Sequence, residues 1–186
     1  MITEFEIKTK QLIDSLKGIW ASYGLGNDGN EFKIITQVFL YKFLNDKFAY
    51  ELKKANNTIA NAENWEEAFN ALSVDDREML SYQLGADTAI LRPEHLISHL
   101  FNRQNEADFA KLFDDTLRDI AKENNDIFAV KTDGGTKITL FEQNGLSNFI
   151  SDESKRDAFC RAIINKLADF SFEKIFTQKY DFFATI

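Results

Sequence analysis

The chain has 186 residues, a hydrophobic content of 44% and 18 Phe, which excludes an intrinsically disordered protein and fits one domain with its own core. One Pro and 8 Gly leave few helix breakers, so the composition favours a mainly α fold. A single Cys excludes an internal disulfide and suits a reducing compartment, and no apolar run is long enough to cross a bilayer. We therefore predict a cytoplasmic protein with no membrane partner.

The net charge of −8 is concentrated in the middle of the chain. Residues 61–126 carry 15 acidic and 6 basic side chains, whereas residues 1–60 carry 7 acidic and 8 basic ones and residues 127–186 carry 8 of each. A phosphate backbone is repelled by the acidic third, so any contact with DNA is expected from the first or the last third. The alternative is an acidic, solvated face without a ligand.

The first predicted helix covers residues 4 to 23 and ends at Gly24, because its apolar residues recur at helical spacing up to Tyr23. The next six residues, Gly24 to Gly29, match the G-x-G-x-x-G string of dinucleotide sites. That motif needs a strand before it, and here a helix precedes it. The string is therefore expected to be a turn between helices.

The second predicted helix, about residues 31–55, has two opposite apolar stripes. Phe32, Phe39, Phe43 and Tyr50 form one stripe, and Ile34, Tyr41, Phe48 and Leu52 form the other. A helix that is apolar on two sides packs on both, so we place it at the centre of a helical bundle. Two narrow polar strips are expected between the stripes, one with Lys33, Lys47 and Lys54, the other with Lys42, Asp46 and Lys53.

Shorter elements are predicted after the central helix. Asn56 to Asn64 is polar and is expected to be a loop. Asn64 with Glu67, and Ser73 with Asp76, have the spacing of helix N-caps. Further helices are expected over Pro93 to Asn102, Asn105 to Asn124 and Asp152 to Phe170. One small β-hairpin, about residues 127–141, is predicted from two β-rich segments, Ile127 to Thr132 and Thr136 to Phe141, that are joined by Asp133-Gly134-Gly135.

The C-terminal segment, residues 172–186, is an apolar run with no helix stop signal after it. We interpret residues 1–171 as a helical domain and residues 172–186 as the start of a connecting helix. The connecting helix would lead to a catalytic domain that this chain lacks. Catalysis would then belong to a longer parent protein.

Two groups of residues are candidates for chemistry. His95 and His99 have the i, i+4 spacing of a metal-binding pair, but the zincin Glu is absent and Leu96 takes its place, so packing histidines are the alternative. Lys47, Lys53 and Lys54 end the central helix and are candidate contacts to a DNA backbone, although cations also complement the dipole of a helix C-terminus. No catalytic constellation, cofactor loop or metal set is predicted.

The segments Leu16-Lys-Gly-Ile-Trp20 and Glu31-Phe-Lys-Ile-Ile-Thr-Gln-Val-Phe-Leu-Tyr-Lys-Phe-Leu-Asn-Asp46 resemble the N-terminal helical domain of the modification subunit of type I restriction-modification systems. The closing residues, Tyr180 to Ile186, resemble the helix that leads into the methyltransferase domain of that family, with Ala184 where Gly is more usual. The resemblance implies a parent that methylates adenine N6 in DNA, uses S-adenosylmethionine, and assembles with a specificity subunit and a restriction subunit. This chain contains neither the Gly-containing cofactor loop nor the Asn-Pro-Pro-aromatic loop.

Three hypotheses follow. In the first, the chain is a DNA- and partner-binding domain that is not catalytic and binds no cofactor by itself. In the second, it is a free-standing α-helical adaptor for protein interactions. In the third, it is a metal-dependent enzyme that uses His95 and His99.

Overall fold

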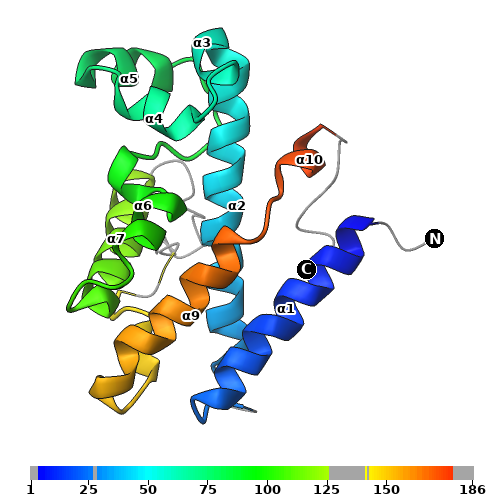
Figure 1. Ribbon diagram of the computed structural model, residues 1–186, viewed down its shortest axis with the longest axis vertical. Coiled ribbons are helices and arrows are strands. Elements are labelled where there is room, and N and C mark those ends of the chain that lie inside the picture. Colours follow the sequence, from blue (N-terminus) through cyan, green and yellow to red (C-terminus); the bar gives the residue numbers. More distant parts are fainter. Residues whose placement is uncertain (1–3, 27–28, 126–140, 142, 178–186) are drawn as a thin grey trace, which may run out of the picture.

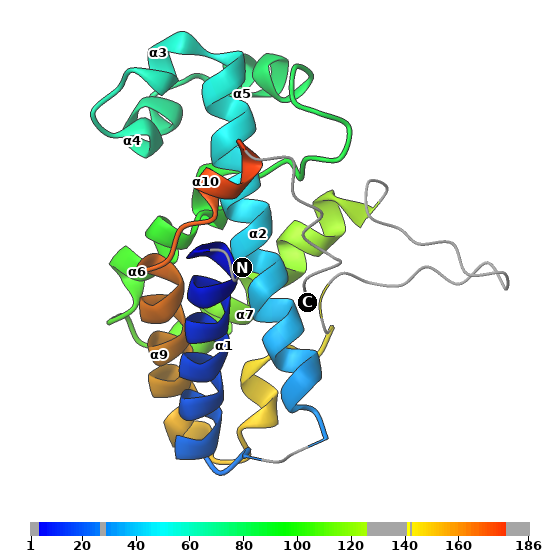
Figure 2. The ribbon, with the colours of Figure 1, turned by 90° about the vertical axis from the view of Figure 1, so that its right-hand side faces the viewer.

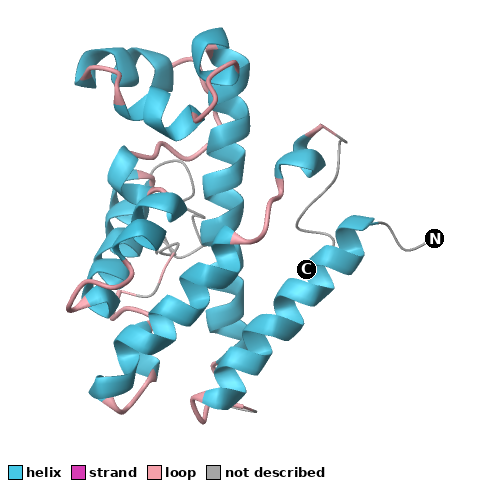
Figure 3. Ribbon diagram, in the orientation of Figure 1, coloured by secondary structure: helices cyan, strands magenta, loops and turns pink. Residues whose placement is uncertain are grey.

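The computed structural model describes residues 4–26, 29–125, 141 and 143–177. One long helix, α2, runs through the molecule, and the other helices are arranged around it (Figure 1). None of the described residues lies in a β-strand, so the prediction of a mainly α fold is confirmed for that part of the chain (Figure 3). The elements are α1 (Glu4–Ser22), α2 (Glu31–Ala55), α3 (Asn57–Ala60), α4 (Trp65–Asn70), α5 (Val74–Ser81), η1 (Pro93–His95), α6 (Ile97–Arg103), α7 (Phe109–Glu123), η2 (Ser147–Phe149), η3 (Glu153–Lys155), α9 (Arg156–Ala168) and α10 (Glu173–Phe176).

The helices form two groups along α2. Helix α1 packs against α2 and α9, and α9 packs in turn against α6 and α7. The short helices α3, α4 and α5 gather at the C-terminal end of α2, whereas α1 and α9 lie along its N-terminal half (Figure 2). Helix α10, which lies near the C-terminus in sequence, packs against α2.

The prediction that α2 is a central, two-sided helix is confirmed. The Phe39 ring lies 5.9 Å from that of Phe172, and on the other stripe Phe48 lies 5.4 Å from Phe69. Both Phe39 and Phe48 are buried. One member of a stripe was predicted wrongly, because Phe32 is 71% exposed. It lies in the first turn of α2, where a helix has neighbours on fewer sides than in its middle.

The junction between α1 and α2 is a helix-to-helix turn, as predicted. Gly24 has φ +79°, the Gly24 N–H donates to the Ala21 carbonyl at 3.1 Å, and the Leu25 N–H donates to the Trp20 carbonyl at 3.0 Å. These bonds form a Schellman motif, which closes a helix at a residue in the left-handed region. The two N-caps are also confirmed: Asn64 accepts from the N–H groups of Glu66 and Glu67, and Ser73 accepts from that of Asp76.

Other boundaries differ from the predictions. The helix expected over 152–170 is the 3-10 turn η3 followed by α9, which ends at Ala168. The expected loop at 56–64 contains the single turn α3, because the Asn56 side chain accepts from the Ile59 N–H at 3.0 Å and Ile59 is buried. The expected helix at 93–102 is broken at Leu96, whose ψ of 144° is extended. Helix α7 begins at Phe109 instead of Asn105, after Asp108 with φ 59°.

Some predictions concern residues outside the described part of the chain. The hairpin predicted at 127–141 lies there, except for Phe141, and so do residues 178–186 of the expected connecting helix. Of that segment the structure describes the buried Phe172 and the short helix α10. In the described part, no helix has the length and apolarity that a membrane span requires.

Candidate functional site

The three lysines predicted as DNA contacts all face carboxylates of this chain. Lys47 is paired with Asp87, Lys53 Nζ lies 2.5 Å from Glu173 Oε1, and Lys54 Nζ lies 3.1 Å from Glu51 Oε2. Each ammonium group also lies over an aromatic ring. The distance from Nζ to the ring centroid is 6.0 Å for Lys47 and Phe43, 5.6 Å for Lys53 and Trp65, and 5.2 Å for Lys54 and Tyr50. Each ammonium group thus has a carboxylate partner within the fold, and a contact of these lysines with a DNA backbone stays a prediction.

The two histidines do not form the helical pair that the metal hypothesis requires. His95 belongs to η1 and His99 to α6, and the extended residue Leu96 separates the two elements. His95 is 1% exposed and its Nδ1 accepts from the Arg92 N–H at 3.1 Å. Burial, together with the Arg92 charge, lowers the pKa of His95 to about 4. Among the described residues, no group of three or more His, Cys, Asp or Glu is placed to hold a metal ion.

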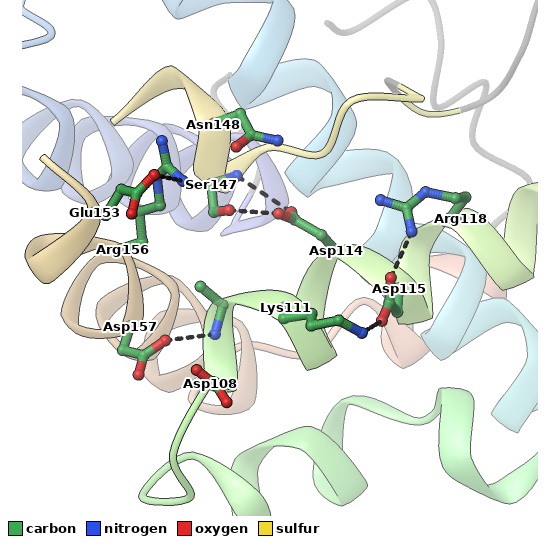
Figure 4. Close-up of a pocket in the computed structure, with 11 residues that line it drawn as sticks. Asp108, Lys111, Asp114, Asp115, Arg118, Ser147, Asn148, Glu153, Arg156 and Asp157 are labelled. Carbon is green, nitrogen blue, oxygen red and sulfur yellow. Dashed lines mark hydrogen bonds and ion pairs between the residues drawn. The ribbon is translucent and has the colours of Figure 1, made fainter. Parts of the chain in front are cut away.

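A cleft of about 410 Å³ lies between α7, η2 and the start of α9 (Figure 4). At its base, the buried Asp114 carboxylate accepts from the Ser147 N–H at 3.2 Å and from the Ser147 hydroxyl. Burial raises the pKa of Asp114, and the two bonds from Ser147 oppose that rise. Gly145 is required beside this pair, because a Cβ there would lie 2.5 Å from the Asp114 carboxylate.

Several other charged groups of this cleft have partners within the fold. Lys111 Nζ lies 2.6 Å from Asp115 Oδ2, and Arg118 is paired with the same carboxylate. Asp157 accepts from the Ala110 N–H at 2.8 Å and so holds the first turn of α7 (Figure 4). A serine nucleophile needs a base and a partner that orients the base, and no imidazole lines this cleft. The cleft therefore has the features of a structural junction.

A buried polar cluster on α2 was missed by the sequence analysis. Lys42 and Asp46 were predicted on a polar strip, but their side chains are 6% and 7% exposed, and Lys42 Nζ lies 3.0 Å from Asp46 Oδ1. Asp46 Oδ2 accepts from the Phe172 N–H at 2.7 Å, and Asn45 Oδ1 accepts from the Ile97 N–H at 3.0 Å. This cluster, Lys42–Asn45–Asp46, thus joins α2 to the start of α6 and to the segment before α10.

The sequence offered no local signal for this cluster. A Lys and an Asp four residues apart are the ordinary pattern of an exposed helix pair. Burial raises the pKa of Asp46, and the Lys42 ammonium and the bonds from Phe172 and Asn45 oppose the rise. The N–H groups that bond to this cluster belong to Ile97 and Phe172, which no local pattern connects to α2.

A second group of lysines lies along a groove between α1 and the end of α9. Lys8, Lys166 and Lys174 line this lysine groove, which has a volume of about 410 Å³. Lys8 Nζ lies 3.0 Å from Glu4 Oε1, and Asp169 is the acidic residue of the lining. The groove is built from the first and last thirds of the chain, which are the thirds that carry no acidic surplus.

No family model, curated protein or solved structure matches the chain.

Proposed function

We propose that the chain is the N-terminal helical domain of a type I restriction-modification DNA methyltransferase subunit, and that it binds DNA and partner subunits without being catalytic by itself. The observation that carries this proposal is the role of α2. The stretch Glu31 to Asp46, one of the segments that carry the resemblance, forms the N-terminal part of the central helix α2, and its last polar residues, Asn45 and Asp46, bond to distant segments. The resemblance therefore involves residues on which the fold depends.

A non-catalytic role agrees with the described surface. The polar groups that the sequence singled out, the two histidines and the three lysines of α2, have partners within the fold. An enzyme that methylates a base must first extrude it from the duplex, so a separate domain that holds the duplex has a clear use. S-adenosylmethionine and the target adenine would then be bound by the parent, and the specificity and restriction subunits would be partners of the assembly.

The lysine groove is the surface that best supports a contact with the DNA backbone. Lys166 and Lys174 are exposed, and they line the groove together with Lys8. Each lysine that neutralises a phosphate adds about one to the slope of log affinity against log salt. We expect the double variant Lys166→Gln/Lys174→Gln to lower that slope by about two. The control Lys54→Gln should leave the slope unchanged, because the Lys54 ammonium is already paired with Glu51.

The decisive experiment uses the natural gene and the purified chain. Under the proposal, the reading frame continues past Ile186 and encodes a Gly-containing loop followed by Asn-Pro-Pro-aromatic. The chain alone transfers no methyl group to DNA and shows no heat of binding with S-adenosylmethionine in calorimetry. A natural stop codon after Ile186, or saturable cofactor binding by the chain, would overturn the proposal. The stop codon would leave the free-standing helical adaptor as the better hypothesis.

A further inference from the structure

An apolar groove of about 470 Å³ opens at the C-terminal end of α2, between α5 and residues 90–94. Its floor is formed by side chains of the core, namely Phe48, Leu52 and Phe69, each 2% exposed or less. Its walls carry Val74, Tyr82 and Ile90, which are 69%, 79% and 39% exposed. We call this surface the α5 groove.

The apolar walls of the α5 groove are unusual for a free surface. Scattered exposed apolar residues need no explanation, but several that line one concave site indicate an interaction surface. Val74, Glu78 and Tyr82 recur every four residues, so one face of α5 is turned toward the groove. The groove is open along a helix of eight residues, which is about 12 Å long and matches two to three turns of a second helix.

The charge around the α5 groove selects the sign of its occupant. Residues 61–94 contain eight acidic and two basic side chains, a net charge of −6. Both basic groups are engaged within the fold: Arg77 donates to the Leu72 carbonyl at 2.9 Å, and Arg92 lies 2.9 Å from Glu94 and 2.8 Å from Glu123. Arg77 and Arg92 line the groove together with Glu78 and Glu94, so the lining is neutral and the acidic surplus belongs to the surrounding residues. An anionic ligand is therefore disfavoured, and a cationic one is attracted.

We propose that the α5 groove binds an amphipathic helix of a partner protein, with apolar residues at i, i+4 and i+7 and with Lys or Arg on its flanks. The apolar side chains fill the groove between Val74 and Tyr82 on one wall and Ile90 on the other, and the flanking cations meet the acidic surroundings. A second copy of this chain is a poorer occupant, because its own net charge is −8. This inference does not depend on whether the parent is a methyltransferase.

The test uses the full chain and three labelled synthetic peptides of about 18 residues, or five helical turns. The first is an amphipathic helix with Leu at i, i+4 and i+7 repeats and Lys on both flanks. The second replaces every Leu by Ser, and the third replaces every Lys by Glu. Fluorescence anisotropy at physiological salt should show saturable binding of the first peptide, and at least about tenfold weaker binding of the other two, since both the apolar face and the charge are required.

Variants of the chain locate the binding. Tyr82→Ser, alone and with Val74→Ser, should weaken the first peptide at least about tenfold. Phe32→Ser, which changes a residue of similar exposure far from the groove, should leave the affinity unchanged. Urea unfolding checks that each variant is folded, and both Tyr82 and Val74 are exposed enough for the fold to tolerate Ser.

Four results would overturn the proposal. The first is equal binding of the Ser-containing peptide, which would show attraction to an acidic surface alone. The second is equal binding of the Glu-containing peptide, which would show that charge does not select the occupant. The third is an equal loss of affinity in Phe32→Ser. The fourth is a concentration-dependent dimer in sedimentation that Tyr82→Ser abolishes, since the occupant would then be a second copy.

Discussion

Replacement of Asp46 by Ala should lower the free energy of unfolding, because it breaks buried polar contacts of α2. The Lys42 ammonium, whose side chain is 6% exposed, would lose the carboxylate 3.0 Å away, and the Phe172 N–H would lose its acceptor at 2.7 Å. Breaking a buried ion pair from one side costs about 3 to 5 kcal/mol, and a buried N–H without a partner costs about 1 to 3 kcal/mol. Because the two effects share one site, we expect a loss of about 4 to 6 kcal/mol in the free energy of unfolding.

Two further variants separate the charge from the hydrogen bond. Asp46→Asn keeps an oxygen that can accept from the Phe172 N–H, so it should cost about 1 to 2 kcal/mol less than Asp46→Ala. The double variant Lys42→Met/Asp46→Leu removes both charges, and the Phe172 N–H and the Asn45 Nδ2 group then lose the Asp46 acceptor. Its cost should be about 1 to 3 kcal/mol, which is less than that of Asp46→Ala alone.

The assay is urea unfolding followed by circular dichroism, with linear extrapolation to water. Asp14→Ala is the matched control, because Asp14 also lies four residues from a Lys, at 3.8 Å from Lys10 Nζ, but its side chain is 61% exposed. We expect that control to cost no more than about 0.5 kcal/mol. A cost of Asp46→Ala no larger than that of the control would contradict a stabilising role of the buried Lys42–Asp46 pair. A double variant whose cost equals the sum of the costs of its two single changes would contradict it as well.

Three other predictions concern the core, pH and the backbone. Phe39→Ala should cost about 3 to 5 kcal/mol in the same assay, because Phe39 is 1% exposed. Phe32→Ala should cost about 0.5 kcal/mol or less, because Phe32 is exposed. A cost below about 1 kcal/mol for Phe39→Ala would contradict the central position of Phe39. The folded pKa of His95 is about 4 against an ordinary 6.5, so its neutral form stabilises the fold above pH 6.5 and that stability is lost as the pH falls toward 4. In urea unfolding at a series of pH values, His95→Gln should remove up to about 3 kcal/mol of this pH dependence, and an unchanged slope would show that His95 is not its source. Gly145→Ala should cost about 1 to 3 kcal/mol, because φ is +84° and the new Cβ would lie 2.5 Å from Asp114. Gly18→Ala is the control and should stabilise the fold by about 0.5 to 1 kcal/mol, because Gly18 lies inside α1 and a Cβ there has nothing within 4 Å. Equal effects of the two substitutions would refute the steric reason.

Several elements were predictable from the sequence because the interactions that define them are local. The 25-residue helix α2 begins and ends where its apolar period begins and ends, and the caps at Asn64 and Ser73 act on N–H groups two or three residues away. The central position of α2 also followed from its two stripes. The helix break at Leu96 was missed, because a pattern of apolar residues continues through it.

The candidate site was less predictable because its contacts join distant parts of the chain. The lysines of α2 look alike in sequence, but Lys47 is paired with a carboxylate 40 residues away and Lys53 with one 120 residues away. The α5 groove arises only when residues 90–94 return to the end of α2 beside α5.

The sequence by itself determined the helical class and the extent of α1 and α2, since composition and periodicity act within a few turns of chain. Only the tertiary structure decided that Lys42 and Asp46 are buried, that the buried His95 Nδ1 accepts from the Arg92 N–H, and which apolar side chains remain exposed. These properties depend on which surfaces cover a residue, and the covering segments come from far along the chain.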